Sequence, residues 1–190
     1  MEQKNFDKLI GIKGFSEQLL RNHFELYKGY IANFTKLNDM LIEMEKQGKS
    51  DACYSELNRR FGWEFNGMRL HELYFGNLTK KQTFLGKNSR LLKELTRQFG
   101  SYEAWERDFK QIGMMRSIGW VILYYDKDSK QLFNIWINEH DAGHLAGAVP
   151  ILVMDVFEHA YMIDYGLKKA DYIEYFFKAV DWNIAEKRFR

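Results

Sequence analysis

The chain has 190 residues, of which 46% are hydrophobic and 16% aromatic, enough for one compact unit or two small lobes that share a core. Its net charge of +2, with no basic run, argues against nucleic-acid binding. The amino terminus has no secretory signal pattern, no apolar run approaches the ~20 residues that span a bilayer, and the single cysteine is typical of a reducing compartment. We therefore expect a cytoplasmic protein with no nucleic-acid or membrane partner.

Helical patterns dominate the first part of the chain. Ser16 is a predicted N-cap, and apolar residues at helical spacing follow it. Gly76 and Asn77 predict a break, and Gly100 and Ser101 separate two further short helices. We expect helices over residues 16–46, 54–60, 65–75, 91–99 and 101–112.

The pattern changes near Trp120, where β-branched and aromatic runs replace the helical spacing. Residues 126–130 are turn-forming and predict a hairpin between two of these runs. The first part of the chain is thus expected to be helical and the rest mixed, with a lobe boundary within residues 80–89. We expect strands over residues 120–125, 132–137 and 151–154, and helices from about Phe157 and Ala170.

The segment Asp155-Val156-Phe157-Glu158-His159-Ala160-Tyr161 is the most informative part of the sequence. It places a carboxylate and an imidazole four residues apart, directly after the apolar run 149–154. Carboxylate oxygen and neutral imidazole nitrogen are ligands that first-row metals accept. A buried strand that delivers both side chains at its carboxyl end would hold them in a fixed arrangement. This spacing alone is a weak signal, so its meaning depends on the other histidines.

The chain contains five histidines: His23, His71, His140, His144 and His159. His23 shares one face of the first helix with Tyr27 and Tyr30, four and seven residues further on. His71 has apolar neighbours within its expected helix. Taken singly, each of these histidines is more often a core residue bonded to a backbone carbonyl than a ligand. His144 is assigned to that structural class.

At these positions the chain resembles the iron/manganese superoxide dismutase family. Residues 155–161 resemble its D-x-[WF]-E-H-A-Y signature, and residues 16–23 with 30–33 resemble its first-helix motif. Residues 66–75 resemble its second-helix motif. Three shorter segments also follow in the family's order: Phe99-Gly100-Ser101, Ile118-Gly119-Trp120 and Val180-Asp181-Trp182. The resemblance covers residues 15–189.

The resemblance implies an α+β fold in which a long N-terminal helical hairpin, residues 1–85, precedes a C-terminal α/β domain, residues 86–190. That second domain would carry a small three-stranded antiparallel sheet, and a metal site would lie between the domains. The implied reaction converts superoxide to dioxygen and hydrogen peroxide by alternate reduction and oxidation of one iron or manganese ion. A nitrogen and oxygen ligand set without a thiolate agrees with these metals. Carried over position by position, the metal ligands are His23, His71, Asp155 and His159.

The resemblance also assigns roles around the metal. His140 matches a position from which many members supply a glutamine that hydrogen-bonds the metal-bound solvent. Gly67 occupies the other place from which members supply that glutamine, and a glycine there leaves room for the side chain of His140. Tyr30 corresponds to a proton-passing tyrosine at the channel mouth, and Trp120 to a wall of the pocket. Histidine at position 140 is typical of a branch in which iron is common, which favours iron or the use of either metal.

The first helix departs from the family pattern near the channel mouth. The separation of His23 and Tyr30 is one residue shorter than usual, so Tyr27 is an alternative gateway residue. Leu26 or Tyr27 stands where many members have a histidine. Met162 replaces the tyrosine that reaches this histidine across the dimer in many members, so both partners of that contact are absent.

Glu158 read by itself is a surface charge at a helix start. In the family this glutamate bonds the ligand histidine of the other subunit, which implies a homodimer, or a tetramer, with Glu158-His159 contacts across the interface. Superoxide is the implied substrate. Lys168 and Lys169 either draw this anion inward or are simply solvated, and solvation is the preferred interpretation.

Two other functions are compatible with these residues. A superoxide-dismutase-like protein that has lost catalysis would have empty or zinc-filled sites. A different metalloenzyme would use two histidines and Asp155 as an iron triad. A third histidine and the nearby His140 leave less open coordination for such chemistry. A superoxide dismutase is therefore the favoured function, with the catalytically impaired metal-binding relative as the alternative.

Overall fold

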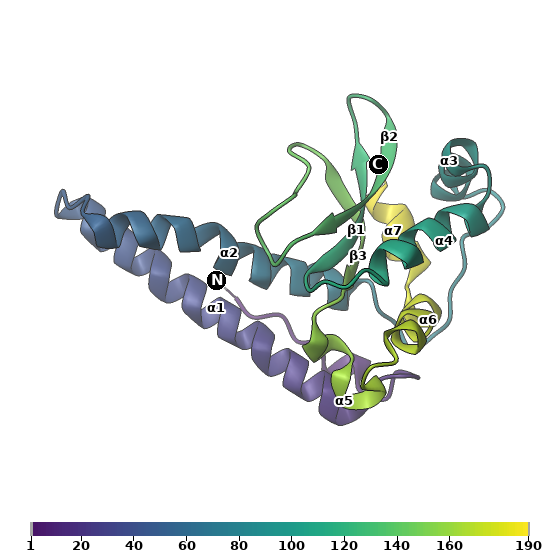
Figure 1. Cartoon of the computed structure of the whole chain (residues 1–190), viewed down its shortest axis with the longest axis horizontal. Helices are drawn as coiled ribbons and strands as arrows, with labels where there is room; N and C mark the ends of the chain where they lie inside the picture. The colour runs from purple at the N-terminus through teal and green to yellow at the C-terminus, as the bar shows by residue number, and fades with distance from the viewer. Residues whose placement is uncertain (1, 190) are drawn as a thin grey trace.

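The computed structural model describes residues 2–189. Its helices are α1 (Glu17–Lys46), α2 (Ala52–Gly76), α3 (Arg90–Phe99), α4 (Tyr102–Gly113), α5 (Met162–Tyr165), α6 (Lys169–Ala179) and α7 (Trp182–Arg188). Its strands are β1 (Trp120–Asp126), β2 (Gln131–Ile137) and β3 (Val149–Asp155), and short 3₁₀ turns cover Asp7–Leu9 and Glu158–Ala160. The expected α+β class is confirmed, since a helical hairpin precedes an α/β region with a three-stranded antiparallel sheet (Figure 1). Within the described residues, no helix has both the length and the apolarity needed to cross a bilayer.

Helices α1 and α2 form the long hairpin that projects from the body of the molecule (Figure 1). Each begins at a side-chain cap. Ser16 accepts a hydrogen bond from the backbone N–H of Leu19 at 3.1 Å, and Asp51 accepts one from Tyr54 at 3.1 Å. These bonds satisfy N–H groups that the first turn of a helix leaves without partners. The predicted end of the first helix at Lys46 is confirmed.

The prediction of two separate helices within residues 54–75 is wrong, because α2 is continuous through Gly62. A glycine in a helix interior costs about 1 kcal/mol relative to alanine. The rings of Phe61 and Phe65 both pack edge-on against Phe34 of α1, with centroid distances of 5.2 and 5.5 Å. These aromatic contacts between the two helices offset the local cost of the glycine.

The sheet has the strand order β2-β1-β3, and both pairings are antiparallel. The central strand, β1, pairs its first residue, Trp120, with Asp155 at the end of β3. Strand β3 lies at the edge of the sheet, where Pro150 is tolerated although it has no N–H to donate. All three predicted strands are confirmed, and β3 begins two residues earlier than expected, at Val149.

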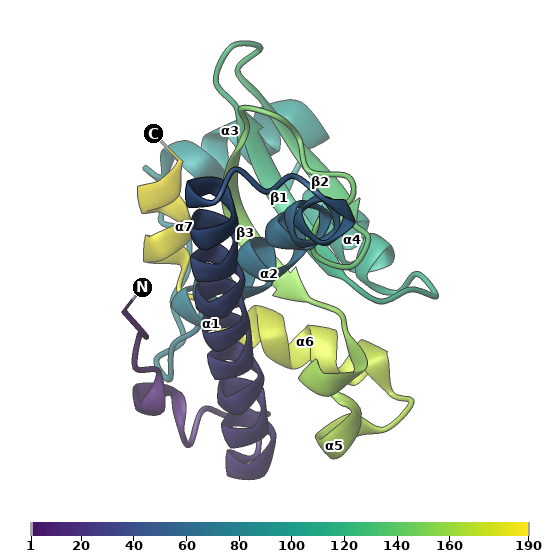
Figure 2. The same ribbon diagram turned by 90° about the vertical axis from the view of Figure 1, so that its left-hand side faces the viewer.

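The sheet lies between the hairpin on one side and α3 and α4 on the other (Figure 1), and α2 packs against β3. Helix α1 also contacts α5 and the turn Glu158–Ala160. In the side view α5 lies beside the lower part of α1 (Figure 2). The helix expected from about Phe157 is wrong, because the chain forms this 3₁₀ turn and then the short α5. The backbone N–H of Phe157 bonds Asp155 Oδ1 at 2.8 Å, a local bond that competes with helix formation.

One hydrophobic core extends through both halves of the described chain. The carboxyl end of α2 is tied to β3 by Arg188 of α7, which donates hydrogen bonds to the carbonyl oxygens of Leu73 and Ile151, each at 3.2 Å. The core and these bonds both cross the expected boundary at residue 85, so the division into two domains stays a prediction.

Candidate metal centre

Four side chains that are far apart in the sequence meet where the hairpin joins the sheet. His23 comes from α1, His71 from α2, Asp155 from the end of β3 and His159 from the following turn. Their candidate ligand atoms all lie within 4.8 Å of one another, close enough to share one ion. His23, His71 and Asp155 are buried, whereas the side chain of His159 is 25% exposed.

One oxygen of Asp155 is the centre of this cluster. The Nε2 atoms of His23 and His159 each lie 3.2 Å from Asp155 Oδ2, and Nε2 of His71 lies 3.7 Å from it. The other oxygen, Oδ1, accepts the bond from the Phe157 N–H described above, which fixes the plane of the carboxylate. Strand β3 therefore delivers its carboxylate with Oδ2 facing three imidazole nitrogens.

The hydrogen bonds of His71 show which of its nitrogens is free. Nδ1 donates to the backbone carbonyl of Gly67 at 2.5 Å, so the proton of the neutral ring lies on Nδ1 and Nε2 has a lone pair. This Nε2 is buried and has no hydrogen-bond partner among the described residues. A buried polar atom without a partner is costly, typically about 1–3 kcal/mol. A cation at the centre of the cluster would satisfy it, so the residues present fit a bound metal.

The charges of the cluster also suit a metal. Burial lowers the pKa of His23 and lowers that of His71 well below its usual value, so both rings are neutral near pH 7. Burial by itself raises the pKa of Asp155, but His159 and His23 outweigh it and hold the carboxyl group ionised. Three imidazoles with one carboxylate form a mixed nitrogen and oxygen set of the kind that iron and manganese accept.

A second group of side chains surrounds His140, which is fully buried. The indole Nε1–H of Trp120 donates to His140 Nδ1 at 3.0 Å, so the imidazole proton lies on Nε2. Nε2 lies 2.8 Å from Tyr30 Oη and donates to it. Burial lowers the pKa of His140 to about 4, which keeps this ring neutral near pH 7. The structure thus joins the three residues expected around the metal in one hydrogen-bonded chain.

Tyr30 reaches His140 because Gly67 makes room for it. Its ring stacks on His71 with a centroid distance of 5.1 Å. A Cβ atom added at Gly67 would lie 2.5 Å from Tyr30 Cδ1. The expectation that this space admits His140 is wrong, since the nearest atoms belong to Tyr30, which then contacts His140 through its hydroxyl group.

Tyr27, the alternative gateway residue, has a different environment. It is 1% exposed, and its hydroxyl donates to Glu72 Oε1 at 3.0 Å and accepts from the backbone N–H of Lys4 at 3.2 Å. Burial raises the pKa of Tyr27 to about 12. Its hydroxyl is therefore engaged with the amino-terminal segment, whereas that of Tyr30 bonds His140.

A cavity of about 660 Å³ leads from the surface to Tyr30 and His159. Arg60 and Trp63 of α2 form part of its wall, and neither was expected at the site. Trp63, Gly67 and His71 are spaced by four residues, which places them along one face of α2. This spacing is the sequence signal that would have indicated Trp63.

Two further residues considered in the sequence analysis, His144 and Lys169, donate hydrogen bonds to backbone carbonyl groups. His144, assigned to the structural class, donates from Nε2 to the carbonyl of His140 at 2.8 Å, and its Nδ1 lies 2.6 Å from the hydroxyl of Tyr124. Lys169 donates to the carbonyl of Met115 at 3.2 Å, and burial lowers its pKa.

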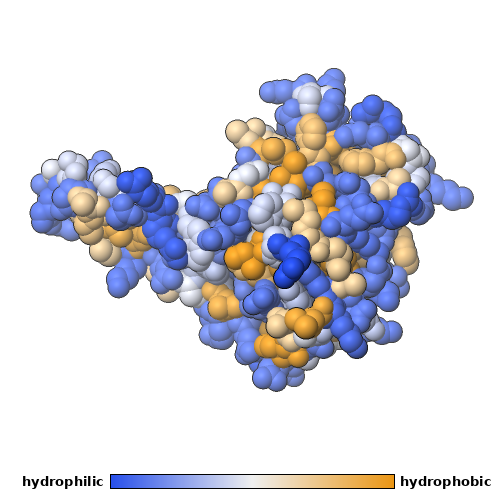
Figure 3. Space-filling view, viewed as in Figure 1, coloured by the Kyte–Doolittle hydropathy of each residue, from blue (hydrophilic) through white to orange (hydrophobic). Residues whose placement is uncertain are grey.

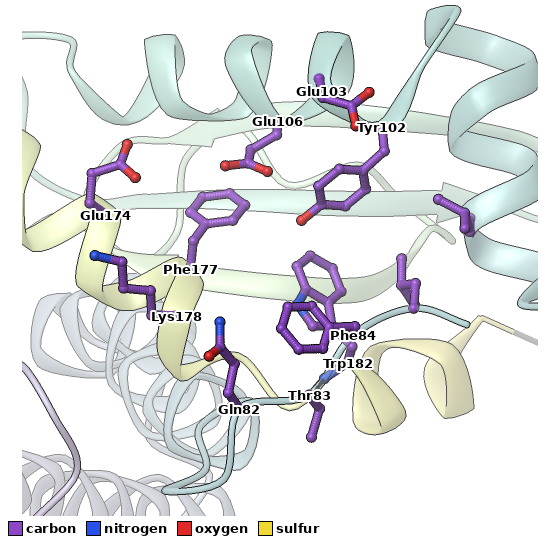
Figure 4. A pocket seen from close by; sticks show the side chains of 12 residues that line it. Gln82, Thr83, Phe84, Tyr102, Glu103, Glu106, Glu174, Phe177, Lys178 and Trp182 are labelled. Carbon is purple, nitrogen blue, oxygen red and sulfur yellow. Dashed lines mark hydrogen bonds between the residues drawn. The ribbon is translucent and has the colours of Figure 1, made fainter. Parts of the chain in front are cut away.

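A second cavity, of about 440 Å³, lies between the segment before α3 and helices α4, α6 and α7. Tyr102, Phe177 and Trp182 gather in it (Figure 4). Two glutamates at its edge, Glu106 and Glu174, both pair with Lys110, at 2.6 and 2.7 Å. None of the four clustered side chains lines this cavity, so it is separate from the candidate metal centre.

Fold and site together define a mononuclear metalloprotein whose ion would lie between a helical hairpin and an α/β region. A family profile described as "Iron/manganese superoxide dismutases, C-terminal domain" matches residues 87–188. The chain is 33% identical to the iron superoxide dismutase of Aquifex pyrophilus, over 100% of this chain and 91% of the relative. It is 33% identical to manganese superoxide dismutase 2 of Haloferax volcanii, over 92% of this chain and 86% of the relative. The chain therefore belongs to the iron/manganese superoxide dismutase family.

Proposed function

We propose that this protein is a superoxide dismutase, with one iron or manganese ion per chain held by His23, His71, Asp155 and His159. The observation that carries the proposal is the buried Nε2 of His71, which has no hydrogen-bond partner within residues 2–189 and faces the same carboxylate oxygen as two other imidazoles. The family membership supports the same reaction.

The bound ion would supply the redox chemistry, taking an electron from one superoxide and passing an electron to the next. Peroxide can leave only after two protons are supplied, and these depend on the residues around the site. Tyr30 Oη accepts the hydrogen bond from His140, so its own O–H is available to donate toward the cavity. Burial raises the pKa of Tyr30, which keeps the phenol protonated near pH 7. We assign proton donation to Tyr30, positioning of Tyr30 to His140, and orientation of His140 to Trp120.

Iron is the metal we propose first, with manganese as a usable substitute. Both metals occur in the names of the relatives, and the ligand set suits either. Histidine at position 140 is the feature that favours iron, and membership in the histidine-containing branch stays part of this proposal. A cytoplasmic location also stays a prediction, drawn from the single cysteine.

Metal exchange tests the proposed function. The purified protein should contain about one iron or manganese ion per chain by elemental analysis and should consume superoxide. Removing the ion with a chelator should abolish this activity, and adding back iron or manganese, but not zinc, should restore it. Stoichiometric iron or manganese without superoxide consumption would instead support the catalytically impaired alternative.

We also propose a homodimer in which Glu158 of each chain bonds His159 of the other. Glu158 is exposed, and its carboxylate forms no hydrogen bond or ion pair within residues 2–189. Apolar side chains are exposed on the neighbouring α5, where Met162 and Ile163 are 39% and 47% exposed, and apolar surface is visible in the region of this helix (Figure 3). Leu26 of α1 is 41% exposed, and it lines the cavity that leads to Tyr30 and His159 together with Ile163. An apolar patch with a charged residue that lacks a partner is typical of a subunit interface.

Sedimentation should show twice the 22.8 kDa mass of one chain, or four times that mass if dimers pair. Glu158→Lys should shift the protein toward the monomer. In each chain it would replace the carboxylate that bonds His159 of the other chain by a positively charged ammonium group, which cannot accept a hydrogen bond. Asp128→Lys, an exposed reversal on the β1–β2 turn, is the matched control and should leave the mass unchanged. A wild-type monomer at micromolar concentrations would contradict this proposal.

A further inference from the structure

We infer that Trp63 and Glu139 form a latch that positions His140 against Tyr30. The indole Nε1–H of Trp63 donates to Glu139 Oε2 at 2.8 Å. Trp63 lies on α2 of the hairpin, and Glu139 directly precedes His140 in the segment that follows β2. This bond therefore connects the hairpin to the residue next to His140, across the gap between the two halves of the chain.

The indole ring of Trp63 also contacts both members of the hydrogen bond that it would control. It packs edge-on against the His140 ring, with a centroid distance of 4.5 Å and an interplanar angle of 74°. Its centroid lies 5.5 Å from that of Tyr30. Trp120 and Phe157 contact the His140 ring from the C-terminal half, so Trp63 completes its surroundings from the hairpin.

The backbone at Glu139 indicates that this arrangement is held under constraint. Its φ angle is +49°, in the left-handed region that non-glycine residues seldom adopt. The turn is closed by paired backbone bonds between Asn138 and Ala142, at 3.0 and 3.3 Å. A strained residue persists where surrounding contacts hold it, and such residues cluster at functional sites. The Trp63 bond to the Glu139 side chain is such a contact.

Arg60 fixes the other side of the latch. Its guanidinium lies over the Trp63 ring at 3.6 Å from the centroid, a cation–π contact. Its Nε donates to Glu64 Oε1 at 2.9 Å within the same helix. Arg60 thus covers one face of the Trp63 indole and is itself held by its hydrogen bond to Glu64. This contact fixes the orientation in which the indole donates to Glu139.

The latch positions His140 and takes no part in the reaction itself. Neither Trp63 nor Glu139 belongs to the cluster of four candidate ligands. Their bond sets where the segment carrying His140 lies relative to α1, and so sets the 2.8 Å contact between His140 Nε2 and Tyr30 Oη. Hydrogen bonds weaken steeply as distance and angle depart from the optimum, so a small shift of this segment is enough to impair the contact.

Two substitutions break the latch in different ways. Trp63→Phe keeps an aromatic ring beside His140 and removes the N–H donor, and Glu139→Ala removes the acceptor. Glu139→Gln keeps an oxygen acceptor and is the conservative variant that should behave as wild type. Trp136→Phe is the matched control, because it removes an indole N–H that donates at 3.0 Å to the carbonyl of Ile118 and takes no part in the Trp63–Glu139 bond.

The readout that does not depend on metal or activity is the Trp120 indole N–H, which is bonded to His140. In metal-free protein labelled with ¹⁵N-tryptophan, hydrogen exchange of this N–H should be ~5-fold or more faster in Trp63→Phe and Glu139→Ala, the factor expected for loss of one net hydrogen bond. Exchange should stay at the wild-type rate in Glu139→Gln and Trp136→Phe.

The effect on turnover rests on the proposed function, whereas the exchange measurement does not. In iron-loaded protein, Trp63→Phe and Glu139→Ala should reduce turnover by a similar factor with unchanged metal content. If the Trp120 indole N–H exchanges at the wild-type rate in Trp63→Phe, the latch is overturned. Equally faster exchange of this N–H in Trp136→Phe would also overturn it. If Glu139→Ala does not fold, Trp63→Phe alone decides. A wild-type protein without superoxide activity would contradict the proposed function and leave the exchange test intact.

Discussion

Replacing Asp155 by asparagine is expected to remove the metal and the superoxide-consuming activity together. The amide has nearly the shape of the carboxylate, and its oxygen still accepts the hydrogen bond from the Phe157 N–H. The substitution removes the one negative charge that faces three imidazole nitrogens. Altering groups outside the ligand set already costs about 10–100-fold in metal affinity, so loss of this ligand should cost more than ~100-fold. Elemental analysis and superoxide consumption measure the two effects.

Thermal unfolding provides an independent check on this variant. A ligand that binds only the folded state stabilises it by about 2.7 kcal/mol at 100 times its dissociation constant. Adding iron or manganese to the metal-free wild-type protein should therefore raise its unfolding temperature, and Asp155→Asn should show no rise. Asp181→Asn is the matched control, since asparagine can replace aspartate as the N-cap of α7. An Asp155→Asn variant that retains stoichiometric metal would contradict the proposed ligand set.

Replacing His140 by leucine is expected to abolish most of the activity while the metal remains bound. His140 contacts Tyr30 and Trp120 by hydrogen bonds and contributes no atom to the cluster of four candidate ligands. Without it the hydroxyl of Tyr30 loses the partner that orients it. Positioned proton transfer contributes typically about 10²–10⁴-fold to a rate, so turnover should fall by at least ~100-fold. Steady-state turnover per bound ion measures this effect.

The same substitution should lower stability, because the buried indole N–H of Trp120 is left without an acceptor. An unsatisfied buried donor costs about 1–3 kcal/mol, which urea unfolding of the metal-free protein can resolve. His140→Gln is the informative comparison, since its amide can accept from Trp120 and donate to Tyr30. It should keep most of both activity and stability. Full turnover in His140→Leu would show that this hydrogen-bonded chain is not needed.

Local sequence patterns predicted most of the secondary structure because the signals are short-range. The Ser16 cap, the Gly100 stop and the turn at residues 126–130 all act within a few positions along the chain, and the structure has these elements. The prediction failed within α2, which continues through Gly62 as one helix. Contacts with Phe34, on the other helix, keep α2 continuous, and no local pattern indicates a contact between two helices.

In the candidate site, too, local sequence signals and contacts between distant elements can be told apart. The sequence by itself determined which residue types are present and the four-residue spacing of Asp155 and His159, and its resemblance to a family indicated His23 and His71. Only the tertiary structure decided that Tyr30 and not Tyr27 bonds His140, and that Trp63 bonds Glu139. These contacts join residues 110 and 76 positions apart. Such partners are selected by the packing of the hairpin against the sheet, and periodicity along one element carries no information about that packing.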